Sequence, residues 1–110
     1  MSNIERKINP SDEKCPVKAT LSLLGGKWTL IILYQINEGV MRYGELKRSI
    51  PGISEKMLIQ SLNDLVKNKL VDKKAYPEIP PRVEYRLTDI GFKTLPIIKK
   101  LEEFGRENLV

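Results

Sequence analysis

The sequence predicts a mainly α-helical domain that carries a small two-stranded β-ribbon. From residue 16 to residue 69, apolar side chains recur at helical spacing, and Gly-Gly and Pro-Gly pairs separate the helical segments. From residue 70 to residue 87, apolar and charged residues alternate on both sides of a proline-rich loop, as in a β-hairpin. A two-stranded ribbon is only marginally stable alone, so we expect it to pack against the helices.

Length and composition limit the class of protein. A chain of 110 residues suits one domain, and a hydrophobic content of 41% excludes a disordered chain. No apolar run reaches the roughly 20 residues that a transmembrane helix needs, and the N-terminus lacks the apolar segment of a secretory signal. The single cysteine excludes a disulfide scaffold and fits a reducing compartment. We therefore expect a cytoplasmic protein that does not bind membranes.

The chain is expected to begin with a flexible arm, because residues 1–14 are polar and of mixed charge. Residues 15–110 then form the folded domain. Its first helix starts at Pro16, which suits the first helical position, and it places Val17 and Leu21 on one face. The next segment, KWTLIILYQINE, is apolar nearly all round and is expected to be the buried central helix.

A helix-turn-helix is predicted next. Segments 43–50 and 54–69 have helical periodicity, and Pro51-Gly52 between them indicates a tight turn. Ser54 can cap the second helix by accepting a hydrogen bond from its first turn. The inward stripe of this second helix consists of Leu58, Leu62 and Leu65.

The opposite face of the second helix carries long or forked donors, namely Lys56, Gln60, Asn63 and Lys67. An ordinary amphipathic helix with a solvated polar face has the same pattern. The charge of the surrounding residues is therefore needed to distinguish such a helix from one that binds DNA. Residues 42–74 hold eight basic and four acidic side chains, which places +4 of the net charge of +5 on this segment. A local basic excess of this kind is typical of a DNA-binding face.

The hairpin that follows is expected to form a wing. The predicted strands are 70–76 and 83–87, and three prolines stiffen the loop between them. Arg82 lies at the tip, where a guanidinium group can enter the minor groove of a duplex. An exposed loop arginine without a function would give the same pattern.

The DNA contacts divide into two kinds. The forked amides of Gln60 and Asn63 suit base edges, whereas Lys67 suits a phosphate. The full set of predicted contacts is Lys47, Ser54, Lys56, Gln60, Asn63, Lys67 and Arg82. Two copies would bind a pseudo-palindromic duplex whose half-sites lie roughly 10 bp, or a multiple of that distance, apart.

The last predicted helix begins after a cap at Thr88 or Asp89 and carries an apolar stripe. Pro96 is expected to kink it, because proline removes a backbone hydrogen bond. Few elements remain to cover the stripe, so we expect a homodimer joined through the first and last helices. The residues predicted for this interface are Val17, Leu21, Leu95, Ile98, Leu101 and Phe104.

Four segments of the chain resemble one family of regulators. They are CPVKATLSLLGGKW, YGELKRSIPGISEKMLIQSL, LVDKKAYPEIPPRVEYRLTDIG and LPIIKKLEEFG, and they are similar to the HxlR-type winged helix-turn-helix transcriptional regulators, also called the DUF24 family. The resemblance implies a homodimeric DNA-binding protein in which the helix after PGIS enters the major groove. Cys15 occupies the position at which some members sense electrophiles or oxidants. Asn63 stands where the family often has arginine, so no base preference carries over.

Other functions fit the residues less well. The chain has no histidine, no CxxC pair and no GxSxG or GxGxxG motif, so we expect no enzyme, metal site or cofactor. Two alternatives remain, a winged-helix module that binds protein alone and a regulator whose small-molecule effector sits at the dimer interface. Cys15 is either a thiol sensor activated by the helix amides and nearby lysines, or a small packing residue.

Overall fold

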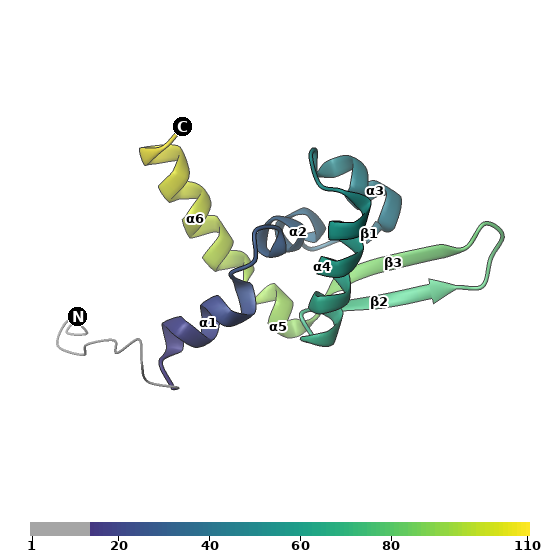
Figure 1. The fold of residues 1–110 in the computed structure, drawn as a ribbon, viewed down its shortest axis with the longest axis horizontal. Coiled ribbons are helices and arrows are strands. Elements are labelled where there is room, and N and C mark those ends of the chain that lie inside the picture. The colour runs from purple at the N-terminus through teal and green to yellow at the C-terminus, as the bar shows by residue number, and fades with distance from the viewer. Residues whose placement is uncertain (1–13) are drawn as a thin grey trace.

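The computed structural model describes residues 14–110, so the arm predicted for residues 1–14 lies outside the described part except for Lys14. The elements in chain order are α1 (Pro16–Leu24), α2 (Thr29–Ile36), β1 (Val40–Arg42), α3 (Tyr43–Ser49), α4 (Glu55–Lys67), β2 (Val71–Tyr76), β3 (Arg82–Leu87), α5 (Asp89–Phe92) and α6 (Leu95–Asn108). Figure 1 shows the β2–β3 hairpin projecting on one side of the molecule, with α1 and α6 extending on the other.

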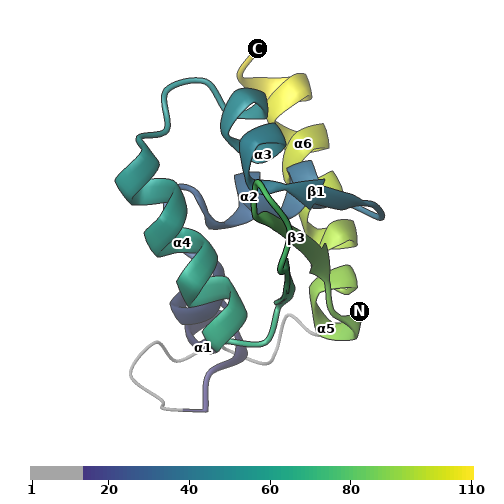
Figure 2. The same cartoon turned by 90° about the vertical axis from the view of Figure 1, so that its right-hand side faces the viewer.

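Helix α2 lies at the centre of the core. It contacts α3, α4, α6 and β3, and its Ile32 and Leu33 side chains are fully buried. In Figure 2, α4 lies on one side of α2 and the sheet, and α6 lies on the other. Within residues 14–110, no single helix is long and apolar enough to cross a membrane, and α1 and α2 pass that test only as a pair bent by 74°.

The sheet has three strands in the order β1-β3-β2, and both neighbouring pairs are antiparallel. In the wing, β2 and β3 pair from Val71 opposite Leu87 to Tyr76 opposite Arg82. The predicted ribbon is confirmed, but the sequence does not predict β1. A strand of three residues offers too little alternation to recognise, and β1 is defined by its pairing with β3, which is distant in the chain.

The C-terminal segment forms two helices, and the prediction of one kinked helix was wrong. The Thr88 hydroxyl accepts a hydrogen bond of 3.0 Å from the Gly91 amide and caps α5, which ends at Phe92. Helix α6 then begins after Thr94, with Pro96 in its first turn. Proline costs no helical hydrogen bond there, because the first-turn amides lack intrahelical partners anyway. Pro96 therefore starts a helix and does not kink one.

Candidate nucleic-acid interface

Helix α4 has two chemically different faces, as the sequence predicts. The Ser54 hydroxyl accepts a 3.1 Å hydrogen bond from the Met57 amide, which fixes the helix start, and Glu55 lies in the first turn. The buried face consists of Leu58, Leu62 and Leu65. The exposed face carries the predicted contacts Lys56, Gln60, Asn63 and Lys67. These four polar side chains are exposed on a helix whose other side is held in the core.

The turn before α4 sets its orientation. Gly52 has a φ of 89°, a left-handed conformation that glycine adopts without strain. Helix α3 packs on α2, and the Glu45 carboxylate accepts a 2.8 Å hydrogen bond from the Arg42 amide at the start of α3. Lys47 is half-buried on α3. Helix α3 thus attaches the helix-turn-helix to α2, and one face of α4 remains exposed at the surface.

Arg82 is less available than the sequence suggested. Its guanidinium lies 3.0 Å from the Glu78 carboxylate and 3.8 Å from the centroid of the Tyr76 ring. Its side chain is only 26% exposed. Arg82 therefore stabilises the loop of the wing in the free protein, and minor-groove contact would require it to leave these partners.

Two exposed apolar residues of α4 were not among the predicted contacts. Ile59 is 47% exposed and Met57 is 38% exposed. At helical spacing Ile59 lies beside Asn63. In the sequence, an apolar residue next to the polar face of a helix is only a weak indication of an exposed binding residue, because an apolar residue fits a core position equally well.

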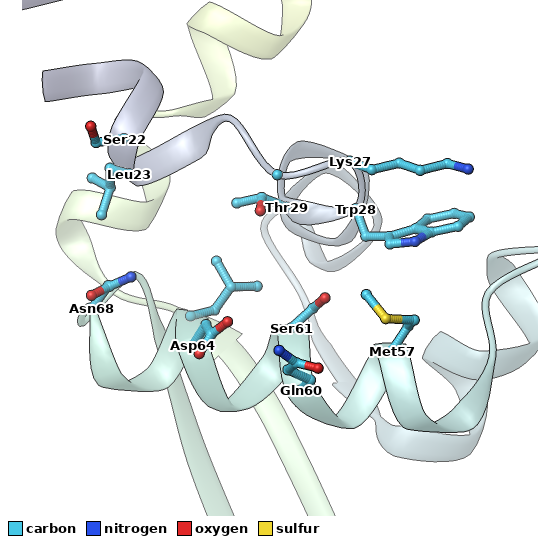
Figure 3. A pocket seen from close by; sticks show the side chains of 12 residues that line it. Ser22, Leu23, Lys27, Trp28, Thr29, Met57, Gln60, Ser61, Asp64 and Asn68 are labelled. Carbon is cyan, nitrogen blue, oxygen red and sulfur yellow. The ribbon is translucent and has the colours of Figure 1, made fainter. Parts of the chain in front are cut away.

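A pocket separates α4 from the junction of α1 and α2, and its volume is about 380 Å³. Figure 3 shows Ser61 and Asp64 of α4 facing Thr29 and Trp28 across this pocket. The ammonium group of Lys27 lies 5.0 Å from the centroid of the Trp28 ring. Gln60 also lines the pocket, so a molecule bound there would touch the predicted DNA-contacting face.

The residues predicted for the dimer interface divide into two groups. Val17 and Leu21 on α1 are 45% and 62% exposed, and Leu101 and Phe104 on α6 are 51% and 59% exposed. Ile98, in contrast, is 7% exposed and belongs to the core of its own chain, against which Leu95 is also packed. Of the residues predicted for the interface, these two exposed pairs are therefore the ones available to a partner.

Cys15 lies at the N-cap of α1 and is 4% exposed. Its carbonyl accepts a 3.0 Å hydrogen bond from the Ala19 amide, as expected at a helix start. The thiol is therefore placed where the sequence predicts it, next to free helix amides. Its burial means that a reagent reaches it only after local opening of this segment.

The pKa values of two tyrosines are raised in the described part of the chain. Burial, and to a smaller extent the charge of Glu55, raises the pKa of Tyr43. Burial, followed by the charge of Tyr43, raises the pKa of Tyr85. Among residues 14–110, no group of three or more metal-binding side chains could hold a metal ion.

Comparisons with known proteins show that the chain is similar to helix-turn-helix regulators. A family model described as HxlR-like helix-turn-helix matches residues 23–110. A protein named as the regulatory protein MalR of Fusobacterium mortiferum is 44% identical over 109 residues, which is 98% of this chain and 100% of the relative. Other similar proteins are named as HTH-type transcriptional regulators.

Solved structures that resemble this chain are also described as regulators. A chain from Porphyromonas gingivalis W83, described as a transcriptional regulator of the MarR family, matches with a TM-score of 0.88 and 60% identity. That match covers 90% of this chain and 97% of the other. The redox regulator HypR in its oxidised form matches with a TM-score of 0.81 and 38% identity, over 87% of this chain and 99% of HypR.

Proposed function

The chain belongs to the HxlR-like helix-turn-helix family of transcriptional regulators, and we propose that it works as a cytoplasmic homodimer on a pseudo-palindromic operator. In this proposal α4 enters the major groove of each half-site, and the wing lies toward the neighbouring minor groove. The family is one of DNA-binding proteins and not of enzymes.

The exposed face of α4 is the observation that carries this proposal. Lys56, Gln60, Asn63 and Lys67 are all exposed on it, while the opposite leucines are held in the core. Gln60 and Asn63 offer paired donor and acceptor groups for base edges, and Lys67 offers a cation for a phosphate. A rigid helix presenting such groups is what direct contact with a base sequence requires.

Dimerisation is proposed to use the exposed apolar residues of α1 and α6. Leu101 and Phe104 of α6 are both more than half exposed. Exposed apolar side chains of this kind favour burial against a partner. A symmetric dimer doubles the DNA contact, since one winged helix covers too few base pairs for specificity.

Two routes of control are proposed for the regulator. The first is modification of Cys15, supported by similarity to HypR, which is named a redox regulator. With one cysteine per chain, oxidation would give a disulfide between the Cys15 residues of two subunits or with a small thiol. The second is a small molecule in the pocket between α4 and the α1–α2 junction, which touches Gln60 directly.

Substitutions on α4 test the proposed DNA contacts. Gln60→Ala should lose about 1–3 kcal/mol on the cognate operator and less on unrelated DNA. Lys67→Ala should weaken binding to both alike and reduce the slope of log affinity against log salt by about one per half-site. Fluorescence anisotropy on the two duplexes over a salt series measures both effects.

Equal losses for Gln60→Ala on the two duplexes would show that Gln60 does not contact bases. If no basic substitution on α4 changes the affinity for either duplex, α4 does not contact DNA, and the alternative of a domain that binds protein alone is favoured.

A further inference from the structure

Helix α4 exposes two large apolar side chains, and they lie in different surroundings. Met57 lines the pocket between α4 and the α1–α2 junction, and Figure 3 shows it next to the ring of Trp28. Ile59 is 47% exposed, does not line this pocket and does not belong to the buried core cluster. Almost half of Ile59 is therefore left in water in the free protein.

The spacing along α4 gives the flank on which Ile59 lies. At 3.6 residues per turn, a step of two residues places side chains about 160° apart, so Ile59 lies almost opposite Met57. A step of four residues places them about 40° apart, so Ile59 lies beside both Glu55 and Asn63. The charge of Glu55 acts on Tyr43, the first residue of α3. Ile59 thus lies on the α3 side of α4, away from the α1–α2 junction.

The proposed dimer interface would not cover this flank. The apolar residues proposed for that interface lie on α1 and α6. In Figure 2, α4 and α6 lie on opposite sides of α2 and the sheet. The side of α4 that faces the α1–α2 junction is the Met57 side, and Ile59 lies on the other one. A second copy bound through α1 and α6 would therefore leave Ile59 exposed.

Ile59 adjoins the face of α4 that is proposed to enter the major groove. Lys56 lies three residues before it and Asn63 four residues after it, and both are exposed. The floor of the major groove presents hydrogen-bond donors and acceptors, which an isoleucine side chain cannot use. It also presents one apolar group, the C5 methyl of thymine. That methyl group is the part of a base edge that suits Ile59, because contact removes the apolar surface of both from water.

We propose that Ile59 is a specificity-determining residue that packs on the C5 methyl group of one thymine in each half-site. This inference rests on the proposed function and adds a base preference to the polar contacts of α4. Thymine is favoured over cytosine at that position, because cytosine carries a hydrogen atom where thymine carries the methyl group. Burial of one methyl group corresponds to about a fourfold gain in affinity per half-site.

Replacement of thymine by deoxyuridine tests the contact, since it removes the methyl group and keeps every hydrogen-bonding group of the base. The probe is a duplex that the wild-type protein selects from a random library. Each thymine is replaced in turn, at the symmetry-related positions of both half-sites. At one position the replacement should weaken wild-type binding about 15-fold, which is about fourfold for each half-site. The same replacement should change the affinity of Ile59→Ala by less than about twofold.

Met57→Ala is the matched control, because it removes an apolar side chain from the other flank of α4. It should keep the full response to deoxyuridine. If no deoxyuridine duplex weakens wild-type binding, or if Ile59→Ala responds as strongly as the wild type, the inference is wrong. Either result leaves the proposed function intact as long as Gln60→Ala still binds the selected duplex more weakly. A wild-type protein that selects no sequence overturns the proposed function and this inference together.

Urea unfolding separates a lost contact from a folding defect. Because Ile59 is exposed, Ile59→Ala should unfold at nearly the same urea concentration as the wild type. Leu62→Ala, which opens a cavity in the core, provides the scale of a true folding defect. A loss of stability in Ile59→Ala as large as in Leu62→Ala would show that Ile59 serves the fold, and it would contradict the proposed contact.

Discussion

The exposed face of α4 and the exposed faces of α1 and α6 differ in what they offer to a partner. The α4 face is formed by amides and ammonium groups that are well solvated in the free protein and can exchange water for base edges and phosphates. The α1 and α6 faces expose Val17, Leu21, Leu101 and Phe104, which gain from burial alone. In the proposed function, one domain would thus separate its polar contacts with DNA from its apolar contacts with a second copy.

A charge in the apolar stripe should have the largest effect. Leu101→Glu places a carboxylate in the proposed interface, so it should give a monomer and reduce operator affinity about 10²- to 10⁴-fold through lost bivalency. Sedimentation and anisotropy measure the two quantities together. Val40→Glu, at a position of comparable exposure on β1, should stay dimeric. A dimeric Leu101→Glu protein would place the interface elsewhere.

A substitution on the buried face of α4 should lower the stability of the protein and should not act on the recognition of DNA. Leu62 is 1% exposed, and Leu62→Ala should lower the free energy of unfolding by about 2–5 kcal/mol because it leaves a cavity. Ile59→Ala, on the exposed side of the same helix, should stay within about 0.5 kcal/mol of wild type. Urea titrations measure both. Similar losses for the two variants would mean that the faces are not distinct.

The cap of α4 should make a smaller contribution. Ser54→Ala leaves the Met57 amide without its side-chain partner and should cost about 1 kcal/mol of stability. Ser61→Ala is a matched control, because Ser61 lies inside the helix and takes no part in the cap. Alanine also favours a helical conformation at this position. If the two serine variants unfold at the same urea concentration, the cap contributes nothing measurable.

The buried tyrosines should make stability fall at high pH. Because burial raises the pKa of both Tyr43 and Tyr85 above the ordinary value of about 10, the unfolded chain loses these protons first. Their contribution is complete below pH 10 and is lost as the pH rises through the raised values. Urea titrations from pH 8 to pH 11 should show a shallower decline in a Tyr43→Phe/Tyr85→Phe double variant. An identical decline would contradict this origin.

The sequence was most informative where local chemistry decides structure. The Ser54 cap, the Pro51-Gly52 turn and the leucine stripe of α4 each depend on neighbouring residues, and the structure confirms them. The wing strands alternate clearly and were also predicted.

The features that sequence missed depend on distant contacts. Strand β1 exists through its pairing with β3, and Ile98 is buried because α6 packs on α2. The sequence predicts Arg82 as a free cation at the tip of the wing. In the structure its guanidinium group instead contacts the Glu78 carboxylate and the Tyr76 ring. The division of the last segment into α5 and α6 follows from the Thr88 cap and from Pro96 lying in a first turn, which spacing alone did not reveal.

Footprinting the dimer on the DNA upstream of its own gene tests the central proposal most directly. Two protected half-sites should appear, roughly 10 bp or a multiple of that distance apart, with pseudo-two-fold symmetry. Protection should be lost in Leu101→Glu and weakened in Gln60→Ala. Protection of one asymmetric half-site, or a folded dimer that protects no DNA there or on a library of genomic fragments, would contradict the proposal.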